Sequence, residues 1–112
     1  MHEFSLAQGL MNQLYQLADE HGAASIVAVR VSIGRLSGIV ADSFSFGFET
    51  LAGANSLTRK AVLEITETEP LHRCLDCGLI TDFSTRICSR CRSTRLAAEG
   101  GDDLVLTQVE ME

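Results

Sequence analysis

The sequence is poor in positive charge and contains no long apolar run. Its 112 residues include 9 lysines and arginines against 15 aspartates and glutamates, which gives a net charge of −6. Lysine and arginine provide the affinity of proteins for phosphate backbones, so this balance argues against nucleic-acid binding. Serine, glycine and arginine interrupt the longest apolar stretches, so we predict no membrane-spanning segment. The length fits one ordinary domain, or a small domain that carries an insert.

The sequence also lacks the motifs that mark common enzymes. It has no G-x-x-x-x-G-K-[ST] phosphate-binding loop, so a GTPase activity would belong to a partner. It has no H-E-x-x-H metalloprotease motif, and its three histidines are His2, His21 and His72. None of them has a nucleophile or carboxylate constellation nearby in sequence. We therefore expect a protein that is not an enzyme.

Cysteine is absent outside two pairs, Cys74-x-x-Cys77 and Cys88-x-x-Cys91, which ten residues separate. A C-x-x-C turn directs two thiolates at one ion, and two such turns complete a tetrahedron of sulfur. Four protein ligands leave no open coordination position, so the pattern predicts a structural Zn(II) site with these four residues as ligands. Iron also accepts tetrahedral sulfur and stays an alternative.

Two disulfides are the other interpretation of the cysteines. The sequence does not begin with the basic start and apolar run of a secretory segment. We therefore expect a cytoplasmic chain, whose thiols stay reduced and available to a metal. Between residues 70 and 100, five arginines face three acidic residues, and this excess offsets the formal −2 charge of zinc with four thiolates. The arginines are Arg73, Arg86, Arg90, Arg92 and Arg95.

The apolar spacing predicts two helices and three strands. Leucines recur at three- and four-residue steps between residues 4 and 21, and a second helix is predicted to begin with Asp42 as its N-cap. Alternating apolar residues predict strands at 25–36, 60–68 and 103–112. Three strands need one sheet to bury their apolar faces. The fold class is therefore α+β, a small three-stranded sheet with two helices plus an inserted zinc-ribbon-like lobe. The predicted domains are an α/β domain over residues 1–69, completed by a returning strand at 101–112, and a metal-binding lobe over residues 70–100.

The N-terminal tripeptide is a second candidate metal site. His2 is too large for removal of the initiator methionine, so Met1 provides an α-amine next to the His2 amide and imidazole. Together these groups form fused chelate rings that suit planar Ni(II) or Cu(II), and Glu3 can add its amide or its carboxylate. Such binding weakens below neutral pH because the ligands take up protons. The alternative is an ordinary solvated N-terminus.

The whole chain resembles the HypA/HybF family of hydrogenase maturation proteins. The resemblance rests on Met1-His2-Glu3, Gly9-Leu10, "VRVSIGRLSGI", "DSFSFGFE" and the two late C-x-x-C pairs, in that order. It implies a nickel metallochaperone for [NiFe] hydrogenase, with a nickel-binding domain over residues 1–69 and an inserted zinc lobe. The nickel ligands then fall on Met1, His2 and Glu3. The zinc ligands fall on Cys74, Cys77, Cys88 and Cys91.

The resemblance further implies a HypB-type GTPase and the hydrogenase large-subunit precursor as partners, and it leaves a homodimer open. The sequence departs from many relatives in the second cysteine pair. No proline follows Cys88, no glycine follows Cys91, and no histidine lies beside the second cysteine of either pair. A coupling of the nickel and zinc sites through such histidines is therefore not expected. The alternative function is a zinc-ribbon module that binds protein or nucleic acid, which would leave the N-terminal tripeptide unused.

Overall fold

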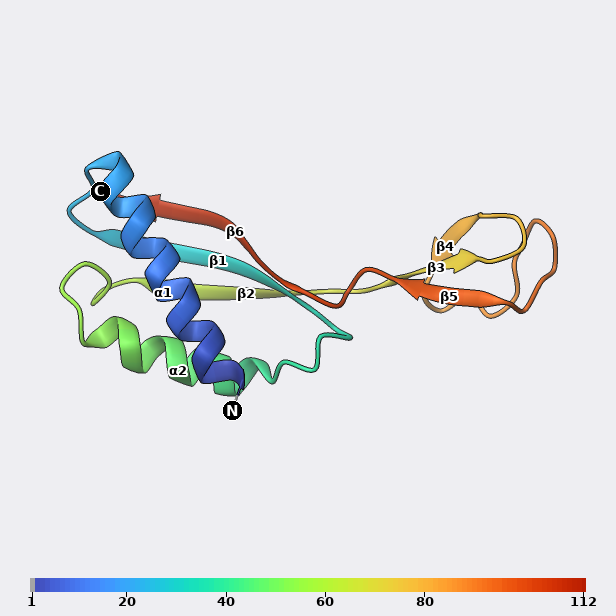
Figure 1. Ribbon diagram of the computed structural model, residues 1–112, viewed down its shortest axis with the longest axis horizontal. Helices are drawn as coiled ribbons and strands as arrows, with labels where there is room; N and C mark the ends of the chain where they lie inside the picture. Colours follow the sequence, from blue (N-terminus) through green and yellow to red (C-terminus); the bar gives the residue numbers. More distant parts are fainter. Residues whose placement is uncertain (1) are drawn as a thin grey trace. The chain divides into compact units, whose positions relative to one another are not determined.

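The computed structural model describes residues 2–112, with side chains from Glu3 onward (Figure 1). The described chain contains two helices and six strands. In chain order they are α1 (His2–His21), β1 (Ile26–Gly34), α2 (Ala41–Gly53), β2 (Val62–Thr68), β3 (Leu71–Cys74), β4 (Ile80–Asp82), β5 (Leu96–Glu99) and β6 (Leu104–Met111). The predicted α+β class with a cysteine-containing lobe is confirmed. Neither helix combines the length and the apolarity that crossing a membrane requires.

Helix α1 forms where the leucine spacing predicts it, and it starts two residues earlier. Its apolar face is buried, and the residues with almost no exposed surface are Ala7, Leu10, Met11, Leu14 and Ala18. The helix ends at His21, and the next residue, Gly22, has a φ of 62°. The N–H groups of Gly22 and Ala23 donate to the carbonyls of Asp19 and Ala18. This pair of bonds satisfies the last carbonyls of the helix, and glycine adopts the required backbone without steric cost.

The predicted cap of the second helix is wrong. The N-cap of α2 is Val40, and Asp42 lies inside the first turn. A valine side chain has no acceptor for the free N–H groups of a helix start, so α2 has no side-chain cap of its own. Asp42 instead places a negative charge near the positive end of the helix dipole. The helix buries Phe44 and Phe48, which are four residues apart and therefore lie on one face.

The larger sheet has the strand order β2-β1-β6. Ser25 and Glu112 exchange backbone hydrogen bonds, and the Gly34 N–H donates to the Asp103 carbonyl. The strands β1 and β6 are therefore antiparallel. On the other side, Ile26 donates to Leu57 and Arg35 donates to Thr68. As the donor moves along the chain, its acceptor moves in the same direction. The strands β1 and β2 are therefore parallel, and α2 is the crossover connection between them.

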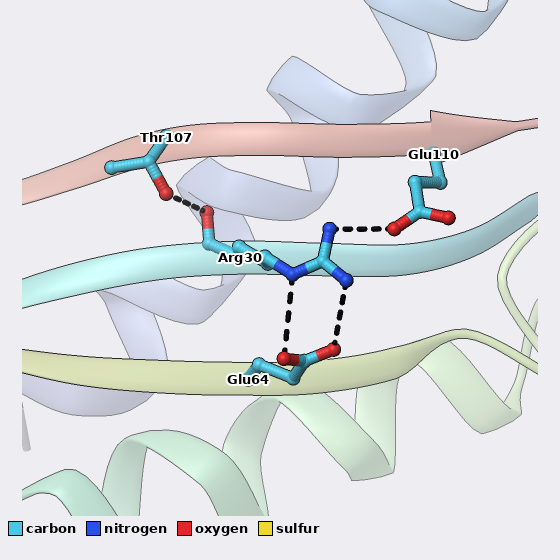
Figure 2. Close-up of polar contacts among 4 residues, drawn as sticks. All are labelled: Arg30, Glu64, Thr107 and Glu110. Carbon is cyan, nitrogen blue, oxygen red and sulfur yellow. Dashed lines mark hydrogen bonds and ion pairs between the residues drawn. The ribbon is translucent and has the colours of Figure 1, made fainter.

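Arg30 joins the three strands of this sheet on one face (Figure 2). Its guanidinium lies 2.5 Å from the Glu110 carboxylate on β6 and 3.3 Å from the Glu64 carboxylate on β2. The Thr107 hydroxyl donates to the Arg30 carbonyl at 3.0 Å. All three charged side chains are partly exposed, so each ion pair alone adds little stability. Their combined effect is to fix the register of β1 against both neighbours.

The chain forms two compact units. The first contains the residues up to Ser32, Ile39–Thr66 and Val105–Glu112, and the second contains Ile33–Gly38 and Glu67–Leu104. The predicted domain boundaries at residues 69–70 and 100–101 stay a prediction. The second unit has its own antiparallel sheet in the order β4-β3-β5. These three strands were not predicted from the sequence.

Within the second unit, two chain segments cross at Gly34 and Gly101. A Cβ atom at Gly34 would lie 2.2 Å from the carbonyl carbon of Gly101, so no larger residue fits there. Gly101 itself has a φ of 67°. The Gly101 carbonyl accepts a hydrogen bond from Leu36 at 2.6 Å. Glycine at both positions is therefore required for this close approach of two backbones.

Candidate metal centre

The four cysteines meet in the second unit. Their Sγ atoms all lie within 4.8 Å of one another, and the pairs Cys74–Cys91 and Cys77–Cys88 are 3.5 Å apart. A tetrahedral ion with metal–sulfur bonds of about 2.3 Å requires sulfur–sulfur distances of about 3.8 Å. All four cysteines are free thiols. The cluster therefore fits one tetrahedral ion, and the predicted ligands are together.

The two C-x-x-C turns have the same backbone hydrogen bonds. Gly78 donates to the Cys74 carbonyl at 2.9 Å, and Arg92 donates to the Cys88 carbonyl at 2.9 Å. The first cysteine of each turn also donates to a carbonyl five residues later, on Leu79 and on Ser93. Each turn thus folds back on itself and directs two sulfur atoms to the same side. We call them the first knuckle (residues 74–79) and the second knuckle (residues 88–93).

The residue after the second cysteine differs between the knuckles. In the first knuckle it is Gly78, with a φ of 80°. In the second it is Arg92, whose φ of 66° is the one positive value among the described non-glycine residues. The missing glycine that the sequence shows therefore leaves the turn geometry unchanged. The cost appears as strain, because a residue with a Cβ is disfavoured in this conformation.

The environment of the thiols favours the charged form at three positions. The backbone N–H located three residues further along the chain lowers the pKa of Cys74 and of Cys88, and the N–H of Leu79 lowers the pKa of Cys77. The N–H of Ser93 also lowers the pKa of Cys91. Burial and the neighbouring cysteines outweigh it and raise that pKa to about 12. The four thiols therefore do not ionise independently, and a cation among them would favour the thiolate form at every position.

His72 is not brought into the cluster as a ligand. Its Nδ1 atom lies 2.8 Å from the carbonyl oxygen of Thr85, and its ring packs against Phe83 with centroids 4.6 Å apart. The histidine therefore attaches β3 to the loop that leads to the second knuckle. This role agrees with the prediction that four thiolates complete the coordination of the metal.

The N-terminal candidate ligands are described only in part. Met1 lies outside the described residues, and the side chain of His2 is not described. His2 begins α1, and the carboxylate of Glu3 accepts a hydrogen bond from the Val40 N–H at 3.2 Å. Glu3 therefore caps the start of α2, which lacks a cap of its own. Sequence reasoning missed this contact because nothing local connects residues 3 and 40.

The cysteine cluster and the fold around it match one family over nearly the full chain. The family model described as hydrogenase/urease nickel incorporation, metallochaperone, HypA matches residues 1–111. The chain belongs to this HypA family. The hydrogenase maturation factor HypA of Rhodobacter capsulatus is 32% identical over 113 residues, which cover 99% of each chain. That of Shewanella halifaxensis is 33% identical over 114 residues, 100% of this chain and 98% of the relative.

Solved structures agree with this assignment. A solution structure of HypA protein superposes with a TM-score of 0.82 and 26% identity, over 100% of this chain and 97% of that one. The solution structure of the Ni metallochaperone HypA from Helicobacter pylori has a TM-score of 0.71 and 25% identity, over 97% and 96%. The predicted family is therefore confirmed. This chain is a nickel metallochaperone of hydrogenase maturation with a metal-binding cysteine cluster, not an enzyme.

Proposed function

We propose that this chain binds Ni(II) through Met1, His2 and Glu3 and hands the ion on for the assembly of [NiFe] hydrogenase. The observation that carries the proposal is the closed four-cysteine cluster in a member of a nickel-incorporation family. A carrier needs a site that exchanges its ion. Four thiolates around one ion leave no position for an incoming ligand, so the cargo must bind elsewhere.

The start of α1 supports a nickel site there. The first N–H groups of a helix have no partner within the helix, and α1 begins at His2. The amides of His2 and Glu3 can therefore lose their protons to a metal without breaking a helical hydrogen bond. The negative charge that results lies at the positive end of the helix dipole. When Met1 is the first residue, its amine and the His2 imidazole would bind the ion on either side of the His2 amide.

The contact of Glu3 with Val40 favours one of its two candidate roles. The carboxylate already accepts the Val40 N–H, so the amide nitrogen of Glu3 is the better candidate ligand. The carboxylate then acts as a positioning group that holds the tripeptide against the start of α2.

In this proposal the cysteine cluster holds a structural Zn(II). The four residues fit zinc in number, type and distance, and the ion would stabilise a lobe with a small core. Cys74, Cys77, Cys88 and Cys91 would be its ligands. The ion would neutralise thiolates that otherwise repel one another.

The proposed partners are a HypB-type GTPase and the hydrogenase large-subunit precursor, in the cytoplasm, and a homodimer is compatible with this scheme. Nucleic acid is not a proposed partner. Two of the five lobe arginines are paired with acidic residues: Arg73 with Glu99 and Arg95 with Asp76. Such pairs reduce the positive charge available to a phosphate backbone.

The test measures nickel and zinc on the purified chain with Met1 as its first residue. Matched samples are His2→Ala and a chain with a short N-terminal extension. We expect one zinc in all three samples and tight nickel binding only in the first. Equal nickel affinity in all three would contradict the N-terminal site. A pull-down with a HypB-type GTPase, next to a nucleic-acid binding assay at physiological salt, tests the partners.

A further inference from the structure

Arg90 and Asp76 occupy the same position in the two knuckles, and each contacts the opposite half of the site. Each is the third residue of its C-x-x-C sequence, and they carry opposite charges. The Asp76 carboxylate accepts hydrogen bonds from the Ser93 hydroxyl, at the end of the second knuckle, and from the Arg95 guanidinium two residues later. The Arg90 guanidinium donates to the Cys77 carbonyl in the first knuckle at 2.8 Å. Two reciprocal contacts therefore connect the knuckles beside the sulfur cluster.

The charge of Arg90 is directed differently from that of its neighbours. Arg73 and Arg95 pair with carboxylates, so their charges are already compensated. No ion pair is found for Arg86 or Arg92 within the described part of the chain. The Arg90 guanidinium is instead bound to the backbone of Cys77, and Arg90 lies between Cys88 and Cys91 in the sequence. Of the five arginines between residues 70 and 100, Arg90 is the one that interacts with the cysteines through its side chain.

We propose that Arg90 is a positioning residue of the four-cysteine site, which joins the second knuckle to the first and compensates part of the negative charge of the thiolates. The inference rests on the proposed zinc site. Zinc with four thiolates carries a formal charge of −2, and a cation with a fixed hydrogen bond nearby lowers the electrostatic energy of that cluster. Release of the ion requires one knuckle to separate from the other, and the Arg90 bond opposes this movement. Arg90 should therefore slow the loss of zinc.

The test is the rate of zinc transfer from the full chain to a chromogenic chelator. The variants are Arg90→Gln, which removes the charge, and Arg90→Lys, which keeps the charge without the planar fork. The matched control is Arg86→Gln, because Arg86 lies in the same part of the lobe and forms no ion pair with the described residues. We expect Arg90→Gln to release zinc about tenfold faster. The variant loses the charged hydrogen bond to the Cys77 carbonyl and the attraction of the guanidinium to the partly exposed thiolates. Arg90→Lys should release it at an intermediate rate, and Arg86→Gln at the original rate.

Salt separates the two parts of the effect. The part due to charge should shrink at high ionic strength, and the part due to the hydrogen bond should persist. An unchanged rate for Arg90→Gln would overturn the inference, and so would an equal acceleration by Arg86→Gln, which would indicate a net-charge effect. Zinc content is measured first. An original chain without zinc would refute the structural zinc site itself, whereas a full zinc content with no effect of Arg90 would refute only this inference.

Discussion

One knuckle has a glycine after its second cysteine and the other has an arginine, and this difference allows a quantitative test of the backbone geometry. Gly78 and Arg92 hold the same left-handed position, with φ values of 80° and 66°. No atom lies within 4 Å of a Cβ built on Gly78, so Gly78→Ala adds conformational strain without a steric clash. That strain is about 1–2 kcal/mol. Arg92→Gly relieves the same strain. The greater conformational entropy of glycine also stabilises the unfolded chain by about 0.5–1 kcal/mol, so the folded lobe gains about 0.5–1 kcal/mol of net stability.

These energies should appear in the zinc affinity, because binding of the metal and folding of the lobe are coupled. A competition between the chain and a chelator of known affinity measures it without interference from the first unit. We expect Gly78→Ala to bind zinc about two- to fivefold more weakly, because the lower flexibility of the unfolded alanine variant offsets part of the strain. Arg92→Gly should bind it about two- to fivefold more tightly.

Arg92→Gly also removes a charge, and Arg92→Ala is the control for that change. Alanine removes the charge but keeps the strained backbone, so its zinc affinity should not rise. If Arg92→Ala gained as much as Arg92→Gly, charge and not backbone conformation would explain the effect. An unaltered affinity of Gly78→Ala would show that this position is not held in the left-handed conformation.

Three further predictions concern the cysteines and the N-terminus. Cys88→Ala should lose zinc and the amide-exchange protection of residues 74–91, since so small a lobe cannot fold without its metal, and retained protection would contradict this. Zinc loading near neutral pH should release at least one proton per ion, because a thiol with a pKa of about 12 is protonated there; an indicator in weak buffer detects it, and zero release would refute the raised pKa of Cys91. Glu3→Gln should bind nickel almost as well as the original chain, because its amide oxygen can still accept the Val40 N–H. Glu3→Ala should bind nickel about two- to tenfold more weakly in calorimetry, and equal losses in both variants would instead indicate a carboxylate ligand.

Local periodicity was sufficient to predict the elements of the first unit. The leucine spacing of α1 and the alternating valines of β1 each bury one face, and such patterns depend only on the neighbouring sequence. The strands of the lobe gave no such signal, because β3, β4 and β5 contain only three or four residues each. An alternation over so few residues cannot be distinguished from a loop. These strands form because the knuckles hold their ends in place, and Cys74 itself is the last residue of β3.

The contacts that sequence reasoning missed connect residues far apart in the chain. Asp42 has the right chemistry for a helix cap, but the carboxylate that binds the start of α2 comes from Glu3, 37 residues away. Counting charges treated the five lobe arginines as equivalent. Their roles differ because their partners differ. Arg73 pairs with Glu99 on the neighbouring strand, 26 residues later, while Arg90 donates to a backbone carbonyl of the other knuckle. In both cases the partner, and not the residue type, decides the role.

The two proposed metal sites separate two ions by geometry. The sulfur cluster is held by equivalent hydrogen bonds in both knuckles, and these bonds oppose a change from tetrahedral to planar coordination. Nickel bound to deprotonated amides prefers a planar arrangement, and zinc has no such preference. The start of α1 can adjust to a planar ion, because its first N–H groups make no helical bonds. A rigid sulfur site and an adaptable nitrogen site in one chain would therefore keep the structural ion and the cargo apart, even when both metals are present.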